Sequence, residues 1–516
     1  MTVGLGLWLV IALSVANLQT ARAEEGDAGG RVHVSGFRFK GNTVLRSEEL
    51  EAAVAGFIGR DCDLAELRKA ADQVTDEYLK RGYSLATAYL PAQDVSGGVV
   101  EIVIVEGRLG RVIVEGNKYV SAGFIARALR NLEGEVVTNA ALERDLLLLN
   151  GCPGLQVKAY LQPGAEAGTV DLRAQAEEAF PIHLTLDANN YGTQFTSRGR
   201  IGAQLDWNNA FLSGGLLSLR AVVGDDPRLF AYGRGSYVLA LSGCGARVGV
   251  WGSKGDFEVS RDLQDLHLTG ETAEGGVYAN FPWIRSRTMG LTTELGFDVK
   301  DSELLLGETP SSNDEIRLAR MAGSFDHAFW EGRLYASATI HQGLGEVFGG
   351  LEEDDRHASR PDADNSFTHF DLDVARVQRV SDTFSFLVRG SGQVSSEPLV
   401  AGEQMSIGGA DSVRGYPQGE FAGDDGANAS FELRAAPLND KGLLQLVAFF
   451  DWGMVHRKLP ATGQPNDQHL TGTGVGLRIS PPWQDASIRF DVGWPLEDEP
   501  SDGREPQFYL AGSLRF

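Results

Sequence analysis

The sequence predicts a mainly β protein, in which a 16-stranded antiparallel transmembrane β-barrel follows two small α+β domains. Three observations predict this fold class. From residue 181 onward, apolar and polar residues alternate with period two in short segments separated by turn residues. About sixteen such segments occur, and an even number suits a closed antiparallel barrel. Before them, one order of elements occurs twice: strand, helix, helix, strand, strand.

The overall composition hides the barrel. Of the 516 residues 42% are apolar, and the mean hydropathy of −0.15 alone would indicate a soluble protein. Each barrel strand turns one face to lipid and one to the lumen, so averaging along the chain cancels the membrane signal. Beyond residue 23 no stretch approaches 18 consecutive apolar residues, which excludes a helical membrane protein.

The charge and the cysteines exclude other classes. A net charge of −24 argues against nucleic-acid binding, because phosphate neutralisation needs clustered Lys and Arg. Most of the acidic excess falls after residue 180, partly in runs such as 352–355. Cys62, Cys152 and Cys244 have no metal-site or disulfide-framework spacing, so they are incidental thiols or form at most one bridge.

The first 23 residues have the form of a signal peptide. Residues 5–15 are almost wholly apolar, and Ala21-Arg22-Ala23 has the small-x-small pattern of a signal-peptidase site. No Lys or Arg precedes the apolar run, so an uncleaved anchor is the alternative. We expect residues 1–23 to be removed on export.

Residues 31–106 and 107–180 form the two repeated domains. In the first, we expect a strand over 32–39, helices over 47–57 and 63–81, and strands over 85–90 and 99–105. In the second, we expect helices over 121–131 and 139–149 and strands over 156–161 and 170–174. The turn Gly41-Asn42 is echoed by Gly116-Asn117. The helical spacing of apolar residues in the second helix gives the buried face Leu64, Leu67, Ala71, Val74 and Leu79.

Residues 181–516 form the barrel. Its strands are expected to begin near residues 181, 197, 214, 229, 246, 265, 287, 315, 332, 366, 383, 428, 443, 470, 485 and 506. Short connections alternate with long ones, as in outer-membrane barrels with periplasmic turns and extracellular loops. Interface-type aromatics include Trp283, Phe329, Trp330 and Trp494. A soluble sandwich or propeller is the alternative, but it would not combine these features with a secretory signal.

Several motifs resemble one family of outer-membrane transporters. The repeated units resemble polypeptide-transport-associated (POTRA) domains, periplasmic modules that bind unfolded chain. Four motifs resemble the hemolysin/hemagglutinin secretion family, the translocators of two-partner secretion: Arg81-Gly82-Tyr83, Leu90-Pro91-Ala92-Gln93, Val105-Glu106-Gly107, and Leu147-Leu148-Leu149-Asn150 before Pro153-Gly154. The terminal Phe516 resembles the signal that the barrel-assembly machinery reads on its clients.

The sharpest motif is Val413-Arg414-Gly415-Tyr416, in the long connection near 398–425. The resemblance implies that this sixth extracellular loop returns into the lumen, where the arginine meets an acid on the inner wall. Asp451 is the candidate, because Phe449-Phe450-Asp451-Trp452-Gly453 matches the family's Phe-x-Asp-x-Gly motif.

The alternation supports this assignment independently. Phe450 and Trp452 belong to the apolar face, which leaves Phe449, Asp451 and Gly453 facing the lumen. A carboxylate aimed at lipid would cost several kcal/mol. We therefore expect a latch in which Arg414 and Asp451 form paired hydrogen bonds in a confined lumen. Gly415 would allow the tight bend beside the arginine, and Tyr416 completes the loop motif.

The chain departs from the family at its start. Family members often begin with a helix that plugs the pore, but here only residues 24–30 separate the cleavage site from the first strand. We expect no plug helix, so the sixth loop alone closes the resting pore, or the pore leaks.

No motif for catalysis occurs. The sequence lacks Gly-x-Ser-x-Gly, His-Glu-x-x-His and a P-loop, and its nine histidines show no metal spacing. The run Gly472-Thr473-Gly474-Val475-Gly476 is better explained as small residues on the inner wall than as a phosphate cradle. We expect no enzyme activity, cofactor or metal, and transport without nucleotide.

The sequence therefore predicts an outer-membrane translocator of a Gram-negative bacterium with POTRA domains in the periplasm. It would capture an unfolded exoprotein by strand addition and secrete it through its pore as a monomer. An outer-membrane protein assembly factor is the alternative, although two POTRA units are fewer than such factors typically have. A passive porin would leave the repeats unexplained.

Overall fold

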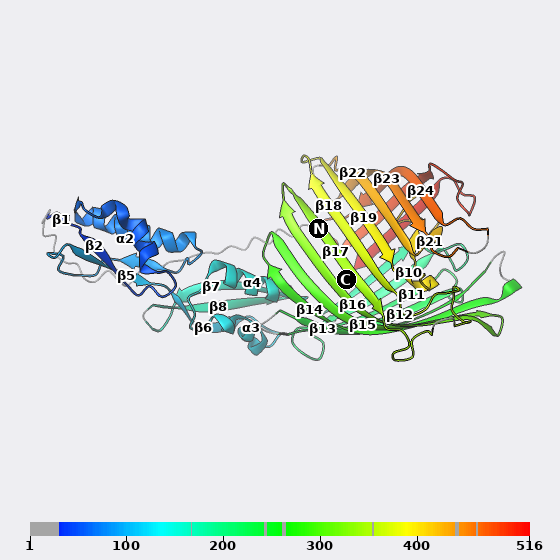
Figure 1. Cartoon of the computed structure of the whole chain (residues 1–516), viewed down its shortest axis with the longest axis horizontal. Coiled ribbons are helices and arrows are strands. Elements are labelled where there is room, and N and C mark those ends of the chain that lie inside the picture. The colour runs from blue at the N-terminus through cyan, green and yellow to red at the C-terminus, as the bar shows by residue number, and fades with distance from the viewer. Residues whose placement is uncertain are drawn as a thin grey trace. The chain divides into compact units, whose positions relative to one another are not determined.

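The computed structural model describes residues 30–166, 168–241, 245–260, 265–352, 355–438, 443–460 and 463–516. The chain divides into an α+β unit, which ends at Ala179, and a barrel unit, which begins at Phe180 (Figure 1). The predicted signal peptide, residues 24–29 and Cys244 lie outside the described residues. Cys62 and Cys152 are both buried in the α+β unit.

The first half of the α+β unit is a three-stranded sheet with two helices. Its elements are β2 (Gly36–Lys40), α1 (Ser47–Val54), α2 (Leu64–Lys80), β4 (Thr87–Tyr89) and β5 (Val99–Val105). The sheet order is β2-β5-β4, with β2 parallel and β4 antiparallel to β5. The single strand expected over 32–39 is instead two, because β1 (Val32–His33) pairs with β3 (Asp61–Cys62) before β2 begins.

The buried face of α2 differs from the prediction at both ends. Leu64 and Leu79 are exposed, whereas Tyr78 is completely buried beside Val74. Tyr78 lies four residues after Val74, about one helical turn, so its side chain faces the same core. Leu79 lies five residues after Val74, which rotates its side chain toward solvent. The prediction that Leu64 and Leu79 belong to the buried face is therefore wrong.

The second half repeats this topology. Its elements are β6 (Arg108–Glu115), α3 (Ala122–Leu129), α4 (Asn139–Leu149), β7 (Leu155–Pro163) and β8 (Thr169–Glu178). The sheet order is β6-β8-β7, with β6 parallel and β7 antiparallel to β8. In both halves the last strand in sequence thus lies between the other two, as expected for a duplicated unit.

The duplicated glycine turn has the same geometry in each half. Gly41 and Gly116 have φ of 93° and 78°, a left-handed conformation that favours glycine. A Cβ at either position would lie too close to a carbonyl oxygen of the neighbouring strand, that of Ile104 or Ala176. The glycine of this turn therefore also permits the first strand to pack closely against the last.

A carboxylate at the end of the last strand accepts hydrogen bonds from the chain just after each turn. Glu106 accepts from Thr43, from the Val44 amide at 3.0 Å and from the buried Tyr78 hydroxyl at 2.8 Å. In the second half Glu178 accepts from three successive amides, those of Lys118, Tyr119 and Val120. Glu106 of the Val-Glu-Gly motif is thus a structural residue of the first half.

We predict that Glu106→Ala destabilises the first half by about 3 kcal/mol, because a buried donor left unpaired costs about 1–3 kcal/mol. Hydrogen exchange of the full chain should show faster exchange across β2, α2 and β5. Glu178→Ala is the matched control and should affect only the second half. Equal exchange in Glu106→Ala and the wild type would contradict this role.

The same carboxylate predicts a pH dependence. Burial alone would raise the pKa of Glu106, but the hydrogen bonds from Thr43, Val44 and Tyr78 together lower it below its ordinary 4.5. A lowered folded-state pKa gives stability that is present above pH 4.5 and lost as the pH falls through the lowered value. Glu106→Gln should flatten this loss of protection in hydrogen exchange below pH 4.5.

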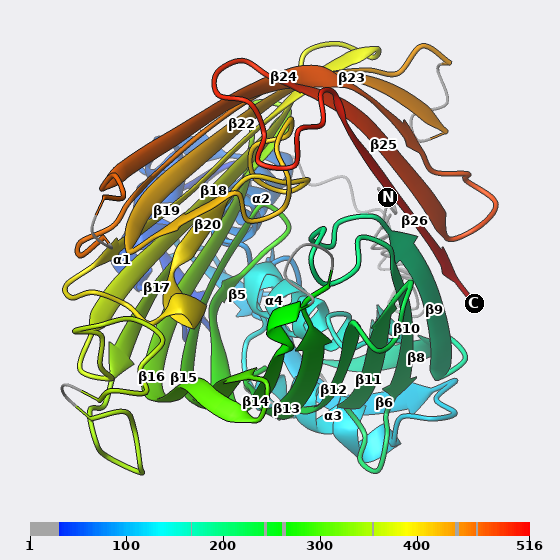
Figure 2. The same cartoon turned by 90° about the vertical axis from the view of Figure 1, so that its right-hand side faces the viewer.

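The barrel unit is a closed ring of sixteen antiparallel strands, which confirms the predicted fold class (Figure 2). In order around the ring these are β9 (Ile182–Asn189), β10 (Arg200–Asn208), β11 (Gly215–Gly224), β12 (Phe230–Ala240), β13 (Arg247–Glu258), β14 (Leu268–Arg285), β15 (Met289–Leu306), β16 (Thr309–Phe329), β17 (Gly332–Gly343), β18 (Thr368–Arg379), β19 (Phe384–Ser395), β22 (Asp425–Ala435), β23 (Leu444–His456), β24 (Asp467–Ile479), β25 (Ala486–Pro495) and β26 (Gln507–Arg515). The largest difference from the expected starts is at β16, which begins six residues earlier because only Gly307-Glu308 separates it from β15.

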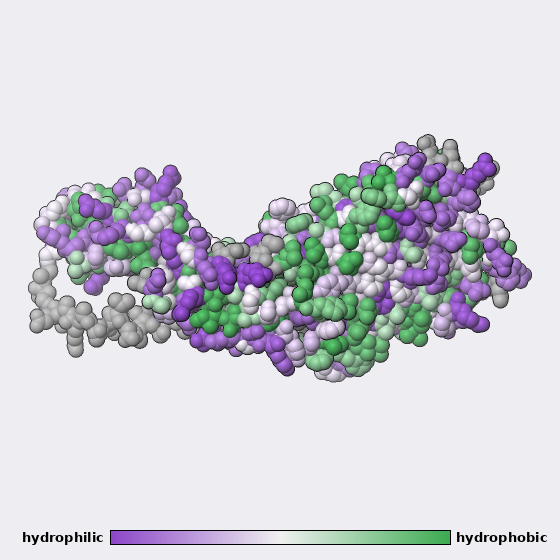
Figure 3. Space-filling model, turned by 90° about the horizontal axis from the view of Figure 1, so that it is seen from below, coloured by the Kyte–Doolittle hydropathy of each residue, from purple (hydrophilic) through white to green (hydrophobic). Residues whose placement is uncertain are grey.

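The outer wall is apolar. Figure 3 shows hydrophobic side chains gathered on the barrel, while hydrophilic ones dominate the end from which the long loops project. On β23, Phe450 and Trp452 are exposed on the outer face, whereas Phe449, Asp451 and Gly453 are buried toward the lumen. No helix among the described residues is long and apolar enough to cross a membrane.

The ring closes between its first and last strands. Only five residue pairs join β26 to β9, Ala511–Arg515 against Thr185–Asn189. The terminal Phe516 extends this seam, because its amide donates to the Leu184 carbonyl at 2.8 Å. Its side chain is exposed on the outer wall, so the last residue contributes to barrel closure through its backbone.

Candidate functional site in the barrel lumen

The sixth loop lies inside the barrel. It connects β19 to β22 through residues 396–424 and contains the short pair β20 (Met405–Ile407) and β21 (Phe421–Gly423). Figure 2 shows β20 within the ring of strands. A small apolar cluster joins the loop to the inner wall; its buried members are Ile407, Val413, Tyr416, Val455 and Leu470. The loop is thus packed against the wall.

Arg414 is completely buried at the centre of this contact. Its Nε and Nη2 donate to the two carboxylate oxygens of Asp451 at 2.7 and 2.9 Å, and its backbone amide donates to Asp451 at 3.1 Å. The guanidinium carbon also lies 3.5 Å from the centroid of the Phe449 ring. The structure therefore brings Arg414, Asp451 and Phe449 together, with both charge-assisted and cation–π contacts.

Two further acids contact Arg414, and sequence reasoning did not identify them. Nη1 donates to Glu432 on β22 at 2.8 Å and to Asp491 on β25 at 3.4 Å. These acids also bind arginines of the barrel wall. Glu432 pairs with Arg434, and Asp491 pairs with Arg478 and Arg489. The site is thus a network of alternating charges across four strands.

Within this network Asp451 depends most on the loop. Every hydrogen bond that the Asp451 carboxylate accepts from the described residues comes from Arg414. Glu432 and Asp491 would keep their wall arginines if the loop left, but the completely buried Asp451 would lose its charge partner. A buried charge without a partner is strongly unfavourable, so the network favours the seated loop.

Gly415 and Tyr416 fix the backbone beside the arginine. Gly415 has φ of 113°, and a Cβ there would press on the backbone of Trp494 and Pro495. The Gly415 amide donates to the hydroxyl of Tyr509 at 3.0 Å, and that hydroxyl donates to the Tyr416 carbonyl at 2.6 Å. The loop motif therefore needs glycine at 415 for both conformation and space.

Small residues on the inner wall make room for the loop. A Cβ at Gly472 would collide with the Arg414 carbonyl, one at Gly493 with the Gly415 amide, and one at Gly453 with Val413. The glycine run of β24 thus contributes to the loop site.

A second anchor holds the other end of the loop. The buried Asp424 forms a two-point ion pair with Arg360 of the fifth loop, which connects β17 to β18 through residues 344–367. Asp424 also accepts from the amides of Leu399 and Lys458, each at 2.8 Å. Leu399 and Val400 also pack in a buried apolar cluster with residues of β16 and the fifth loop. The loop is therefore held at its tip by Arg414 and at its base by Asp424.

A closed sixteen-stranded barrel, whose sixth loop carries an arginine buried against the inner wall and which follows two α+β halves of the same topology, defines an outer-membrane barrel transporter. The family model "Haemolysin secretion/activation protein ShlB/FhaC/HecB" matches residues 168–479, and the model "POTRA domain, ShlB-type" matches residues 32–107. The chain belongs to this haemolysin secretion/activation family. It is a two-partner secretion translocator of the outer membrane, with its POTRA region in the periplasm.

Similar proteins agree with this assignment. The heme/hemopexin transporter protein HuxB of Haemophilus influenzae is 23% identical over 92% of this chain and 85% of its own length. The outer membrane transporter CdiB of Dickeya dadantii is 27% identical over 89% and 82%. The hemolysin transporter protein ShlB of Serratia marcescens is 23% identical over 90% and 82%.

Solved structures compare in fold alone. CdiB from Escherichia coli superposes with a TM-score of 0.80 at 22% identity, covering 96% of this chain and 92% of its own. BamA from Haemophilus ducreyi, without its first three POTRA domains, gives 0.56 at 16% identity over 94% and 100%. The predicted alternative, an assembly factor, is therefore the more distant match.

Proposed function

We propose that the ion pair of Arg414 and Asp451 is a latch that holds the sixth loop in the lumen and controls the pore through which the partner protein passes. One observation supports this most: a completely buried arginine, carried by a loop, is the hydrogen-bond partner of a completely buried wall carboxylate. Phe449 and Gly453 belong to the same latch, Phe449 by its ring contact and Gly453 by the space it leaves for Val413.

The cargo in this proposal is a secreted exoprotein delivered unfolded from the periplasm. Sheet order leaves β2 and β4 as the outer strands of the first half and β6 and β7 as those of the second. An outer strand can pair with an extended segment through backbone hydrogen bonds, with little demand on side chains. The second half, residues 107–180, acts here as a second POTRA domain, because its topology repeats the first.

Passage through the pore needs no chemical step in this proposal. Folding of the exoprotein outside the cell would supply the driving force. The transporter works as a monomer, and Phe516 is the residue that the barrel-assembly machinery reads during biogenesis. Support for the last point comes from its place at the end of the closing strand, with an exposed aromatic side chain.

Single-channel recordings of the purified full chain test the gating role of the loop. Removing residues 398–424 should give a larger and steadier conductance, because the loop and its contacts occupy the lumen. Heat-modifiable migration in gel electrophoresis would show that the shortened barrel still folds. A conductance equal to that of the wild type would contradict the proposal that this loop obstructs the pore.

A further inference from the structure

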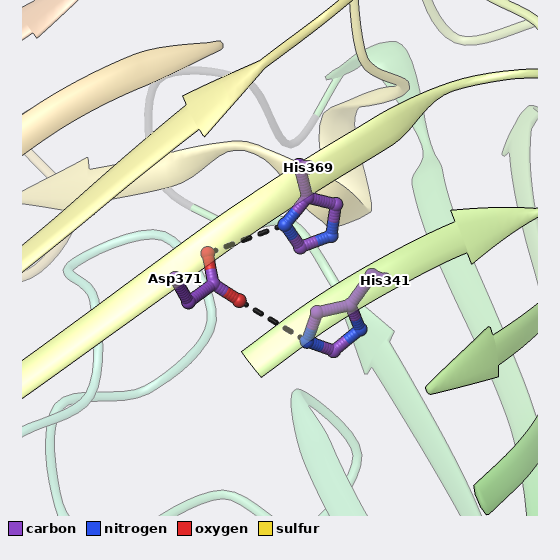
Figure 4. Close-up of side chains that lie close together, drawn as sticks. All are labelled: His341, His369 and Asp371. Carbon is purple, nitrogen blue, oxygen red and sulfur yellow. Dashed lines mark hydrogen bonds and ion pairs between the residues drawn. The ribbon is translucent and has the colours of Figure 1, made fainter. Parts of the chain in front are cut away.

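Two histidines and an aspartate lie together on the inner wall, away from the latch. His341 near the end of β17 and His369 at the start of β18 are direct cross-strand partners. Asp371 follows two residues after His369 on the same face of β18 (Figure 4). The histidines are 28 positions apart in sequence and are joined through the fifth loop, so only the strand register brings them side by side.

The side chains converge on one small volume. His341 Nε2 lies 3.1 Å from Asp371 Oδ2, and His369 Nδ1 lies 3.2 Å from Asp371 Oδ1. The two imidazole rings are stacked with centroids 4.3 Å apart and planes 8° from parallel. One potential ligand atom from each of the three residues lies within 4.8 Å of the others.

Each imidazole ring has a second nitrogen, which does not contact Asp371. His341 Nδ1 and His369 Nε2 are buried and accept or donate no hydrogen bond among the described residues. His369 is only 3% exposed. Its Nε2 faces the carboxylate of Glu403, at 3.6 Å, and Glu403 is itself bound by Lys300 at 2.6 Å. Glu403 belongs to the sixth loop.

We propose that His341 Nε2, His369 Nδ1 and the Asp371 carboxylate bind a divalent first-row transition metal ion, with Zn²⁺ as the representative. Ligand atoms about 2.0–2.1 Å from a tetrahedral zinc ion lie about 3.3 Å apart, and the two histidine–aspartate separations of 3.1 and 3.2 Å are close to this value. Because an imidazole lone pair lies in the plane of its ring, an ion bound to both histidines would turn the two rings out of their parallel stacking. Two imidazoles and a carboxylate suit zinc and its neighbours better than Mg²⁺ or Ca²⁺, which prefer oxygen. Asp371 is partly exposed, so an ion can enter from the lumen.

Glu403 fits the outer shell of such a site. A metal-bound histidine commonly donates its other ring N–H to a carboxylate, which fixes the ring and makes the nitrogen a better ligand. Glu403 is placed to accept from His369 in this way, and Lys300 holds Glu403 in turn. The bound ion would therefore connect the wall strands β17 and β18 to the start of the sixth loop.

Metal binding by the purified full chain, made without a histidine tag and stripped with a chelator, tests the proposal. Titration with ZnCl₂ in a calorimeter, and metal analysis after gel filtration, should find one tightly held Zn²⁺ per chain. His341→Gln combined with His369→Gln should reduce the bound zinc to background. Glu403→Gln should keep the site but weaken it roughly tenfold, as outer-shell changes typically do.

His456→Gln is the matched control. His456 also lies on a barrel strand and pairs with a carboxylate, that of Asp467 at 2.8 Å, and it is outside the proposed site. This variant should bind zinc like the wild type. If the double variant fails to show the heat-modifiable band of a folded barrel, Asp371→Asn replaces it. Wild-type zinc content no higher than that of the folded ligand variant would overturn the proposal and leave the cluster as an ordinary ion-pair group.

Discussion

Arg414→Ala is expected to leave the barrel assembled and to reduce secretion of the partner exoprotein roughly a hundredfold or more. Removing the guanidinium leaves Asp451 buried without its partner, and such a change typically costs about 3–5 kcal/mol. Since about 1.4 kcal/mol corresponds to a factor of ten, the seated loop would lose most of its population. Immunoblots of the culture medium, from cells that co-express the partner exoprotein, measure the effect.

Conservative variants separate the latch from a general loss of charge. Arg414→Lys keeps a positive charge but cannot form the two-point contact with Asp451, so it should be intermediate. Asp451→Asn removes the buried charge but leaves Arg414 with Glu432, and should be milder than Arg414→Ala. In a double-mutant cycle, Arg414→Ala and Asp451→Ala should be strongly non-additive.

A second wall arginine, Arg333, provides the control for this experiment. Arg333→Ala removes another wall arginine that pairs with a single carboxylate, Asp326, and it should secrete normally. Heat-modifiable migration verifies folding of each variant. Unchanged secretion by a folded Arg414→Ala barrel would show that the buried pair is not a latch for transport.

The strands of the barrel could be predicted closely because the alternation of apolar and polar residues has a direct physical cause. A period of two is imposed by the pleat, and lipid on one side allows few exceptions. The same reasoning predicts that Phe449 and Asp451 face the lumen, and both side chains are buried on that face of β23. In the α+β unit the prediction was wrong at Leu79, because tyrosine also fits a buried helix face when its hydroxyl finds a partner.

The partners across the lumen could not be predicted in this way. Glu432 and Asp491 occupy inward positions, but the alternating pattern assigns polar residues to every such position, so nothing marks these two as neighbours of Arg414. The cluster of His341 and His369 depends on the register across the fifth loop, which the sequence spacing does not contain. Contacts of the sixth loop depend likewise on how it folds back, and only the family motif indicated its tip.

The glycines of the inner wall allow a test that leaves the charges of Arg414 and Asp451 unchanged. A methyl group at Gly472 would lie well inside van der Waals contact with the Arg414 carbonyl, and the rigid strand cannot yield. Gly472→Ala should therefore displace the loop and pull Arg414 away from Asp451. Overpacking of this kind costs about 1–3 kcal/mol, so we expect secretion to fall roughly tenfold in a folded barrel.

The matched control is Gly390→Ala on β19, where the nearest atom to an added Cβ is 3.6 Å away and the methyl group has room. It should secrete like the wild type. Because Gly472→Ala and Arg414→Ala act on the same seated loop, the double variant should be little worse than Arg414→Ala alone. Normal secretion by Gly472→Ala would mean that the loop need not lie against β24 during transport. If the losses of secretion caused by the two substitutions add in the double variant, Gly472 affects secretion in a way that does not depend on the Arg414–Asp451 pair.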